Sequence, residues 1–148
     1  MIFIFLIILH LYLPIIYYNH IDVSPDFFLL SIIFFSIKNN TYKIILAGLL
    51  FGFVNDLLIS TNYFGAITIL YMVFSYYLLR INIFKTHAIY NIFIILSFYI
   101  IIFLMYLLRY SDSYFFYIKY SLIKTLLIFL FLLLFDKIFG VSKKYVKR

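Results

Sequence analysis

Long apolar runs separated by short polar segments dominate the chain. The runs cover residues 1–18, 25–37, 42–59, 64–79, 89–108 and 117–135. Each is read as a transmembrane helix, because about 20 apolar residues at ~1.5 Å per residue cross a hydrocarbon core of ~30 Å. The run 25–37 is the shortest, and a re-entrant segment is the alternative to a full span there. The pattern predicts an all-α integral membrane protein, folded as a compact bundle of six transmembrane helices.

Composition supports a membrane protein and leaves no room for a soluble domain. Of the 148 residues, 68% are hydrophobic and only 11% are charged, with a mean hydropathy of +1.16. A soluble globular domain needs far more polar surface. We therefore expect one transmembrane domain over residues 1–148. The chain has no cysteine and only three scattered histidines, so neither a metal site nor a cofactor is expected.

Basic residues are unevenly divided between the two sides of the predicted bundle. One side holds Lys38, Lys43, Arg80, Lys85, Lys137, Lys143, Lys144, Lys147 and Arg148. The other side holds only Arg109, Lys119 and Lys124, around the start of the last run. The positive-inside rule therefore predicts that both termini are cytoplasmic. A re-entrant second segment would spoil this asymmetry, so six true spans are favoured.

The net charge of +7 follows from this sidedness and does not indicate a nucleic-acid-binding face. Residues 136–148 are expected to form a basic cytoplasmic tail that lies against anionic lipid headgroups. Tyrosines gather at the ends of the predicted spans, as in an aromatic belt. Tyr63 is placed at the outer boundary and Tyr42 at the inner one.

A stripe of small and acidic residues runs along the third predicted span. Gly48, Gly52 and Asp56 follow one another at four-residue spacing, which places them on one helix face. The glycines would let a neighbouring backbone come close, either within the bundle, which is favoured, or in a partner protein. A carboxylate in hydrocarbon needs a partner, so we expect Asp56 to pair with Lys124 or Lys119. The alternative is that Asp56 reaches the outer headgroups.

Two further features mark the ends of predicted spans. Ser24, Pro25 and Asp26 read as a helix cap, a first helical position and an acidic first turn. A recognition role for Asp26 is the less favoured alternative. Gly65 follows a short polar turn and is expected to let the fourth span begin close to the third.

These motifs, in this order, resemble the rod shape-determining protein MreD family. The resemblance covers about residues 25–79 and rests on Ser24-Pro25-Asp26, on Gly48-x-x-x-Gly52-Phe53-x-x-Asp56-Leu57-Leu58, and on Phe64-Gly65. Asn55 departs from the small or apolar residue expected before the aspartate. The resemblance implies a non-enzymatic, multi-pass component of the bacterial inner membrane that serves peptidoglycan synthesis during cell elongation. It also implies an MreC-like partner and, through it, MreB filaments and a RodA-type synthase.

The residues alone also favour a scaffold over an enzyme. The sequence has no recognisable nucleophile–base pair and no glycine-rich phosphate loop. The alternative function is a small-molecule-binding membrane subunit of an energy-coupling-factor-type transporter. Its binding cavity would lie at the outer end of the bundle and be lined by Asp26, Asp56, Lys119 and Lys124.

Overall fold

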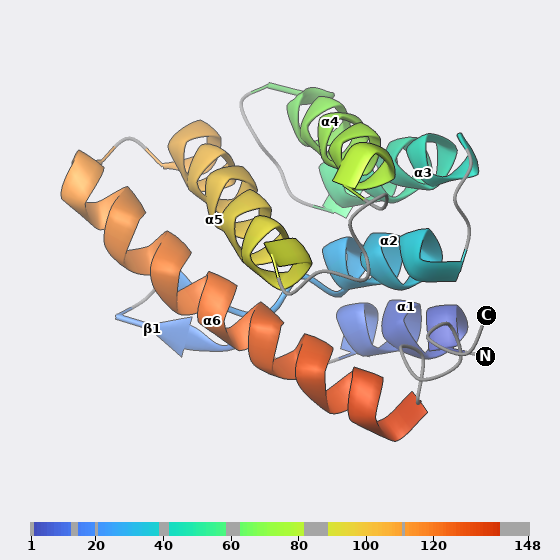
Figure 1. Ribbon diagram of the computed structural model, residues 1–148. Coiled ribbons are helices and arrows are strands. Elements are labelled where there is room, and N and C mark those ends of the chain that lie inside the picture. The colour runs from blue at the N-terminus through green and yellow to red at the C-terminus, as the bar shows by residue number, and fades with distance from the viewer. Residues whose placement is uncertain are drawn as a thin grey trace.

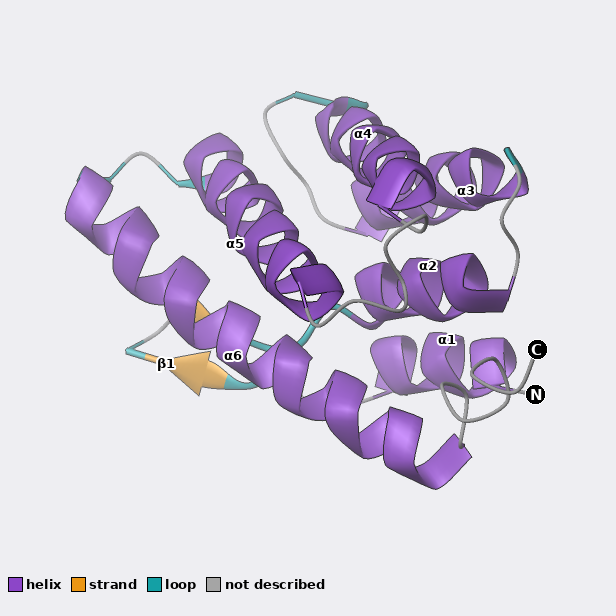
Figure 2. Cartoon of the chain, viewed as in Figure 1, coloured by secondary structure: helices purple, strands orange, loops and turns teal. Residues whose placement is uncertain are grey.

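The computed structural model describes residues 2–12, 15–19, 21–38, 42–58, 63–81, 89–110 and 112–139. Within these residues the chain forms six helices and one short hairpin (Figure 1). The elements are α1 (Ile2–Tyr12), β1 (Tyr17–Tyr18), β2 (Ile21–Asp22), α2 (Phe27–Lys38), α3 (Lys43–Leu58), α4 (Ala66–Ile81), α5 (Ile89–Arg109) and α6 (Tyr114–Phe139). The chain is thus mostly helical, as Figure 2 shows.

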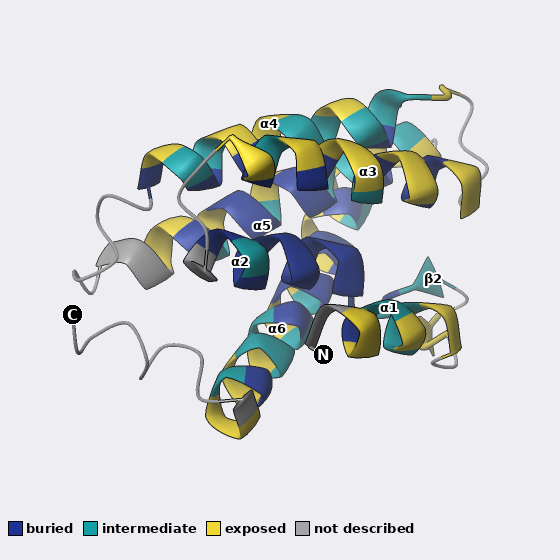
Figure 3. Ribbon diagram, turned by 90° about the vertical axis from the view of Figure 1, so that its right-hand side faces the viewer, coloured by how far each residue is buried: buried dark blue, intermediate teal, exposed yellow. Residues whose placement is uncertain are grey.

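Helix α2 is the centre of the bundle. It packs against α1, α3, α4 and α6, and its ribbon is almost entirely in the buried colour in Figure 3. Its sequence is apolar except for the buried Ser31 and Ser36 and the terminal Lys38, which is close to the pattern of a helix that other helices surround. Twelve residues give a length of only ~18 Å.

Four of the remaining helices form two antiparallel pairs around α2, and α1 packs against α2 by itself. Helices α3 and α4 make the closest pair, and α5 lies beside α6, as Figure 1 shows. Helix α4 also contacts α5 and so joins the two pairs. The polar side chains described below lie where α1 and α5 end, α2 and α4 begin and α3 ends. We call this the polar end of the bundle.

The prediction for the first span is wrong in the second half of that segment. The pattern predicts a helix over residues 1–18, whereas α1 ends at Tyr12. Pro14 follows two residues later, and a proline nitrogen cannot donate the next helical hydrogen bond. The residue before a proline is also driven out of the helical conformation.

A small β-hairpin takes the place of the end of that span in an otherwise helical structure. Tyr17 pairs with Asp22 and Tyr18 with Ile21 in an antiparallel register. Asn19 has a φ of 49°, a left-handed conformation that asparagine adopts more readily than most residues. Such a residue in a two-residue loop reverses the chain between two strands.

The other five expected runs each contain a helix whose ends lie within a few residues of the expected ones. Among the described residues, two helices are long and apolar enough to cross a membrane, over Ile92–Arg109 and Tyr114–Ile138. Phe27–Ser36 and Ala66–Ile81 are shorter apolar helices. Most of the expected basic tail, residues 140–148, lies outside the described residues.

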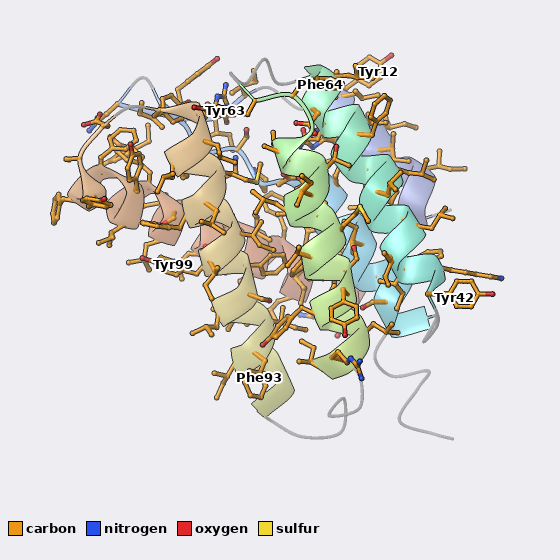
Figure 4. All side chains as sticks on the ribbon, turned by 90° about the horizontal axis from the view of Figure 1, so that it is seen from above. Tyr12, Tyr42, Tyr63, Phe64, Phe93 and Tyr99 are labelled. Carbon is orange, nitrogen blue, oxygen red and sulfur yellow. The ribbon has the colours of Figure 1, made fainter. Side chains whose placement is uncertain are left out.

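Aromatic side chains project from both ends of the bundle. In Figure 4, Tyr12, Tyr63 and Phe64 lie at one end, and Tyr42 and Phe93 lie toward the other. Tyr63 and Phe64 belong to the turn before α4 at the polar end, and Tyr42 directly precedes α3. The polar end is therefore the end that the sequence assigns to the outer side.

Candidate functional site

The carboxylate of Asp26 starts α2. Its Oδ1 accepts hydrogen bonds from the backbone N–H groups of Phe28 at 3.0 Å and Leu29 at 3.2 Å. Its own carbonyl accepts from the N–H of Leu30 at 3.2 Å, which is the first bond of the helix. Asp26 is thus the N-cap, and its charge lies at the positive end of the α2 dipole.

The expected cap assignment is therefore shifted by two residues. Ser24 was expected to cap the helix and Pro25 to occupy its first turn, but both residues precede Asp26, which is the cap. The N–H of Ser24 donates to the carboxylate of Asp22 at 2.9 Å, and its hydroxyl donates to the same oxygen. Ser24 thus lies in the segment before the helix, because the carboxylate of Asp26, two residues later, accepts the hydrogen bonds of the first helical turn.

Asp26 also links three helices through its second oxygen. Oδ2 accepts from the hydroxyl of Tyr71 in α4 and from Nδ2 of Asn55 in α3, the latter at 3.4 Å. Asn55 Nδ2 also donates to the Tyr71 hydroxyl at 2.7 Å. All three side chains are buried, with Asn55 and Tyr71 fully excluded from solvent. This triad fixes α2, α3 and α4 against one another at the polar end.

Asp56 caps the start of α4 as Asp26 caps the start of α2, although Asp56 itself belongs to α3. Its carboxylate accepts from the backbone N–H of Ile67 at 3.3 Å and of Thr68 at 2.8 Å. The Thr68 hydroxyl donates to it at 2.5 Å. Gly65, with a φ of +89°, sits in the turn that brings the start of α4 to this carboxylate. An added Cβ at Gly65 would meet nothing within 4 Å, so its backbone conformation is what favours glycine there.

The glycine stripe of α3 faces α4. A Cβ added to Gly48 would lie 2.7 Å from the Tyr71 carbonyl oxygen and 2.0 Å from Oγ of Ser75. A Cβ added to Gly52 would lie 2.7 Å from the Cα of Thr68. Since real Cβ contacts this short do not occur, the two backbones can approach this closely only where α3 has glycine. The space beside both glycines is thus filled by α4 of the same chain, so the glycines serve packing within the bundle, which is the favoured of the two expected roles.

The expected ion pair between Asp56 and a lysine is not formed. Asp56 is already satisfied by the start of α4, whereas Lys119 is exposed, with Nζ 5.4 Å from the centre of the Tyr18 ring. Lys124 is 9% exposed, and its Nζ lies 5.8 Å from the centre of the Tyr106 ring. Similar depth along two helices does not bring side chains together when the helices present different faces.

A third acidic residue, Asp22, lies at the hairpin. Asp22 forms an ion pair of 3.4 Å with Arg109 at the end of α5, and its carbonyl accepts from the Tyr106 hydroxyl at 2.7 Å. Burial alone would raise the pKa of the Asp22 carboxyl. The attraction of Lys124, the hydrogen bonds from Ser24 and the charge of Arg109 outweigh burial, so the pKa of Asp22 lies below its ordinary value.

These groups surround a pocket of about 320 Å³ at the polar end. Its polar lining consists of His10, Asp22, Ser24, Asp26, Asn55, Arg109 and Lys124. A cavity thus lies at the polar end with two of the four expected residues, Asp26 and Lys124, in its wall, whereas Asp56 and Lys119 do not line it. The volume is at the small end of the range of ligand pockets.

Sequence reasoning missed several residues of this pocket. Asn55 was noted only as a departure from the family pattern, and Arg109 only as a charge in the orientation count. Asp22 lies in a segment that was interpreted as a loop, and His10 lies in a segment that was interpreted as part of the first span. A signal was available for Asn55, because an amide next to Asp56 inside an apolar run must find a buried partner.

Comparison of the chain with protein-family models, with curated proteins and with solved structures found no match. Among the described residues, no group of three or more His, Cys, Asp or Glu side chains is arranged to hold a metal ion.

Proposed function

We propose that this chain is a six-span membrane scaffold of the MreD type, with both termini in the cytoplasm of a bacterium. It acts without catalysis, by holding a single-span MreC-like partner in the cell-elongation machinery. Through that partner it is linked to MreB filaments and a RodA-type peptidoglycan synthase.

The outward-facing side chains support a membrane setting. Large apolar residues at the exposed positions of α3, α4 and α6 include Leu46, Leu50, Phe53, Leu57, Ile69, Val73, Leu122, Leu126, Leu130 and Leu134. Soluble proteins rarely expose apolar patches of this extent. Lipid contact accounts for such a surface without a desolvation penalty, and the aromatic side chains at both ends of the bundle suit the two headgroup regions.

One observation carries the family assignment within this proposal. The three motif segments behind the resemblance converge on one structural unit made of α2, α3 and α4. Asp26 caps α2 and holds α3 and α4, Asp56 caps α4, and Gly48 and Gly52 admit the α4 backbone. Residues brought together by chance composition would not be expected to take such interdependent roles.

This arrangement changes where the partner is expected to dock. Because α4 fills the glycine notches and Asp56 is satisfied, neither offers a free surface to a second protein. We propose that Gly52 and Asp56 support the partner interface indirectly, by fixing the shape of the α2–α3–α4 unit. Residues 136–148 would add affinity for anionic lipids on the cytoplasmic side.

The experiment is replacement of the native gene by tagged variants, with cell shape and copurified membrane proteins as readouts. The parent chain should support rod shape and retain a single-span partner with a periplasmic domain. Gly52→Leu should lose both, whereas Phe53→Leu on the exposed face of the same helix should lose neither. Rod-shaped cells after complete loss of the protein would refute the proposal.

The pocket supports a second candidate function, a small-molecule-binding subunit of a transporter. In that case the tagged chain would retain a pair of ATP-binding cassette proteins instead of a single-span partner. Loss of the chain would then impair uptake of one nutrient without rounding the cells.

A further inference from the structure

Asn55 leaves one hydrogen-bond acceptor unused in the wall of the pocket. Its Nδ2 serves Asp26 and Tyr71, while its Oδ1 is buried and has no hydrogen-bond partner in the part of the chain that is described. A buried carbonyl oxygen without a donor costs roughly 1–3 kcal/mol. The pocket therefore calls for a donor, such as an ammonium or a hydroxyl group.

Lys124 places a cation in the wall of the same pocket, where it attracts Asp22 from beyond ion-pair distance and, in the part of the chain that the structure describes, contacts no anion directly. Only 9% of it is exposed, and within the described residues no carboxylate lies within ion-pair distance of its ammonium group. Its nearest recorded contact is the face of the Tyr106 ring, which compensates a buried charge only in part. The pocket therefore also calls for an anionic group.

The two acids of the pocket are satisfied by other groups. Asp26 accepts four hydrogen bonds from α2, α3 and α4. Asp22 forms an ion pair with Arg109 and accepts hydrogen bonds from Ser24, and Lys124 attracts it from a greater distance. Among the described lining residues, two acids and two bases balance in formal charge, so a ligand of zero net charge, such as a zwitterion, disturbs this balance least.

We propose that the pocket binds a small zwitterionic group, with its anionic oxygens on Lys124 and its ammonium on Asn55 Oδ1. Two sources share this chemistry, the headgroup of a phosphoethanolamine lipid and a free solute that carries the same groups. Leu11, Ile15 and Leu58 line the pocket and are each more than half exposed, so that the rim is apolar. The inference does not rest on the scaffold role.

The test measures binding to the purified full-length chain in a maltoside detergent by native mass spectrometry and thermal shift. The probes are dihexanoyl-phosphatidylethanolamine, dihexanoyl-phosphatidylglycerol and O-phosphoethanolamine. The ethanolamine lipid should bind at least about tenfold more tightly than the glycerol lipid, which lacks the ammonium group. Lys124→Met should weaken this binding by about tenfold or more.

Lys119→Met is the matched control, because Lys119 lies on the same helix but outside the pocket, and it should bind as the parent does. Leu58→Trp narrows the pocket at its rim without changing a charge, so it should also weaken binding. If Lys124→Met does not fold, the effect of Leu58→Trp tests the proposal in its place. Binding of O-phosphoethanolamine with the same variant dependence would identify a free solute, and binding of the lipid alone would identify a headgroup. Equal binding of both lipids, equal binding by the two lysine variants, or no saturable binding would overturn the proposal.

Because the measurement uses the isolated chain, its failure leaves the partner-dependent scaffold role untouched. Conversely, failure to retain an MreC-like partner would not affect the binding result.

Discussion

Replacement of Asp56 by alanine tests how the acidic residue in α3 is held. The change removes the acceptor of the Ile67 and Thr68 N–H groups and of the Thr68 hydroxyl. Loss of a cap costs about 1 kcal/mol and up to ~2, and the lost charge at the helix start adds up to ~2 more. Asp56→Ala should thus lower the free energy of unfolding by about 1–4 kcal/mol, measured by denaturant titration in micelles.

A double-mutant cycle separates this contact from the ion pair that the sequence suggested. Thr68→Val removes only the hydroxyl, so Asp56→Ala and Thr68→Val should couple by about 1 kcal/mol. Asp56→Ala and Lys124→Met should add within about 0.5 kcal/mol, because Lys124 does not contact Asp56. Stronger coupling of Asp56 to Lys124 than to Thr68 would refute the capping account.

Three further predictions concern packing, the buried triad and charge. Gly52→Ala places a Cβ 2.7 Å from a backbone carbon of α4 and should lower the free energy of unfolding by about 1–3 kcal/mol. The control Leu49→Ala, on the exposed face of α3, should lower it by less than ~0.5 kcal/mol, and equal losses would contradict the close approach of the two helices. Tyr71→Phe removes the hydroxyl that bonds to Asp26 and Asn55 and should lower the free energy of unfolding by about 1–3 kcal/mol. A variant as stable as the parent chain would show that these hydrogen bonds are not formed. The pKa of Asp22 is lower in the folded chain than in the unfolded one, so its contribution to stability is present above pH ~4 and is lost as the pH falls through the folded-state pKa. Lys124→Met should raise that pKa, as followed by NMR of the labelled carboxyl carbon, and an unchanged pKa would show that Lys124 does not act on Asp22.

Helix positions were largely predictable, because apolar runs and their interruptions are local properties of the sequence. The exception is the run 1–18, where the prediction followed hydropathy through Pro14 and missed the hairpin at Asn19. Hydropathy reports burial in protein or lipid and cannot distinguish a strand from a helix when the segment is short.

The site was predictable in part of its members, since Asp22, Asn55 and Arg109 were missed, and its connections were not predictable. Spacing along α3 correctly grouped Gly48, Gly52 and Asp56 on one face, which is a property of a single helix. Which helix covers that face depends on how the helices are rotated about their axes, and the depth of Lys124 along α6 carries no such information. The partner of Asp56 is therefore the start of α4, whose free N–H groups carry a partial positive charge.

Cysteine accessibility in intact cells tests the proposed membrane topology most directly. The chain contains no cysteine, so single replacements need no altered background. Tyr63→Cys and Ser113→Cys lie at the polar end, and Tyr42→Cys lies at the opposite end. A membrane-impermeant maleimide should label residues 63 and 113 in whole cells and residue 42 only after lysis. Labelling of residue 42 in whole cells, or protection of residues 63 and 113, would contradict a six-span bundle whose polar pocket faces outward.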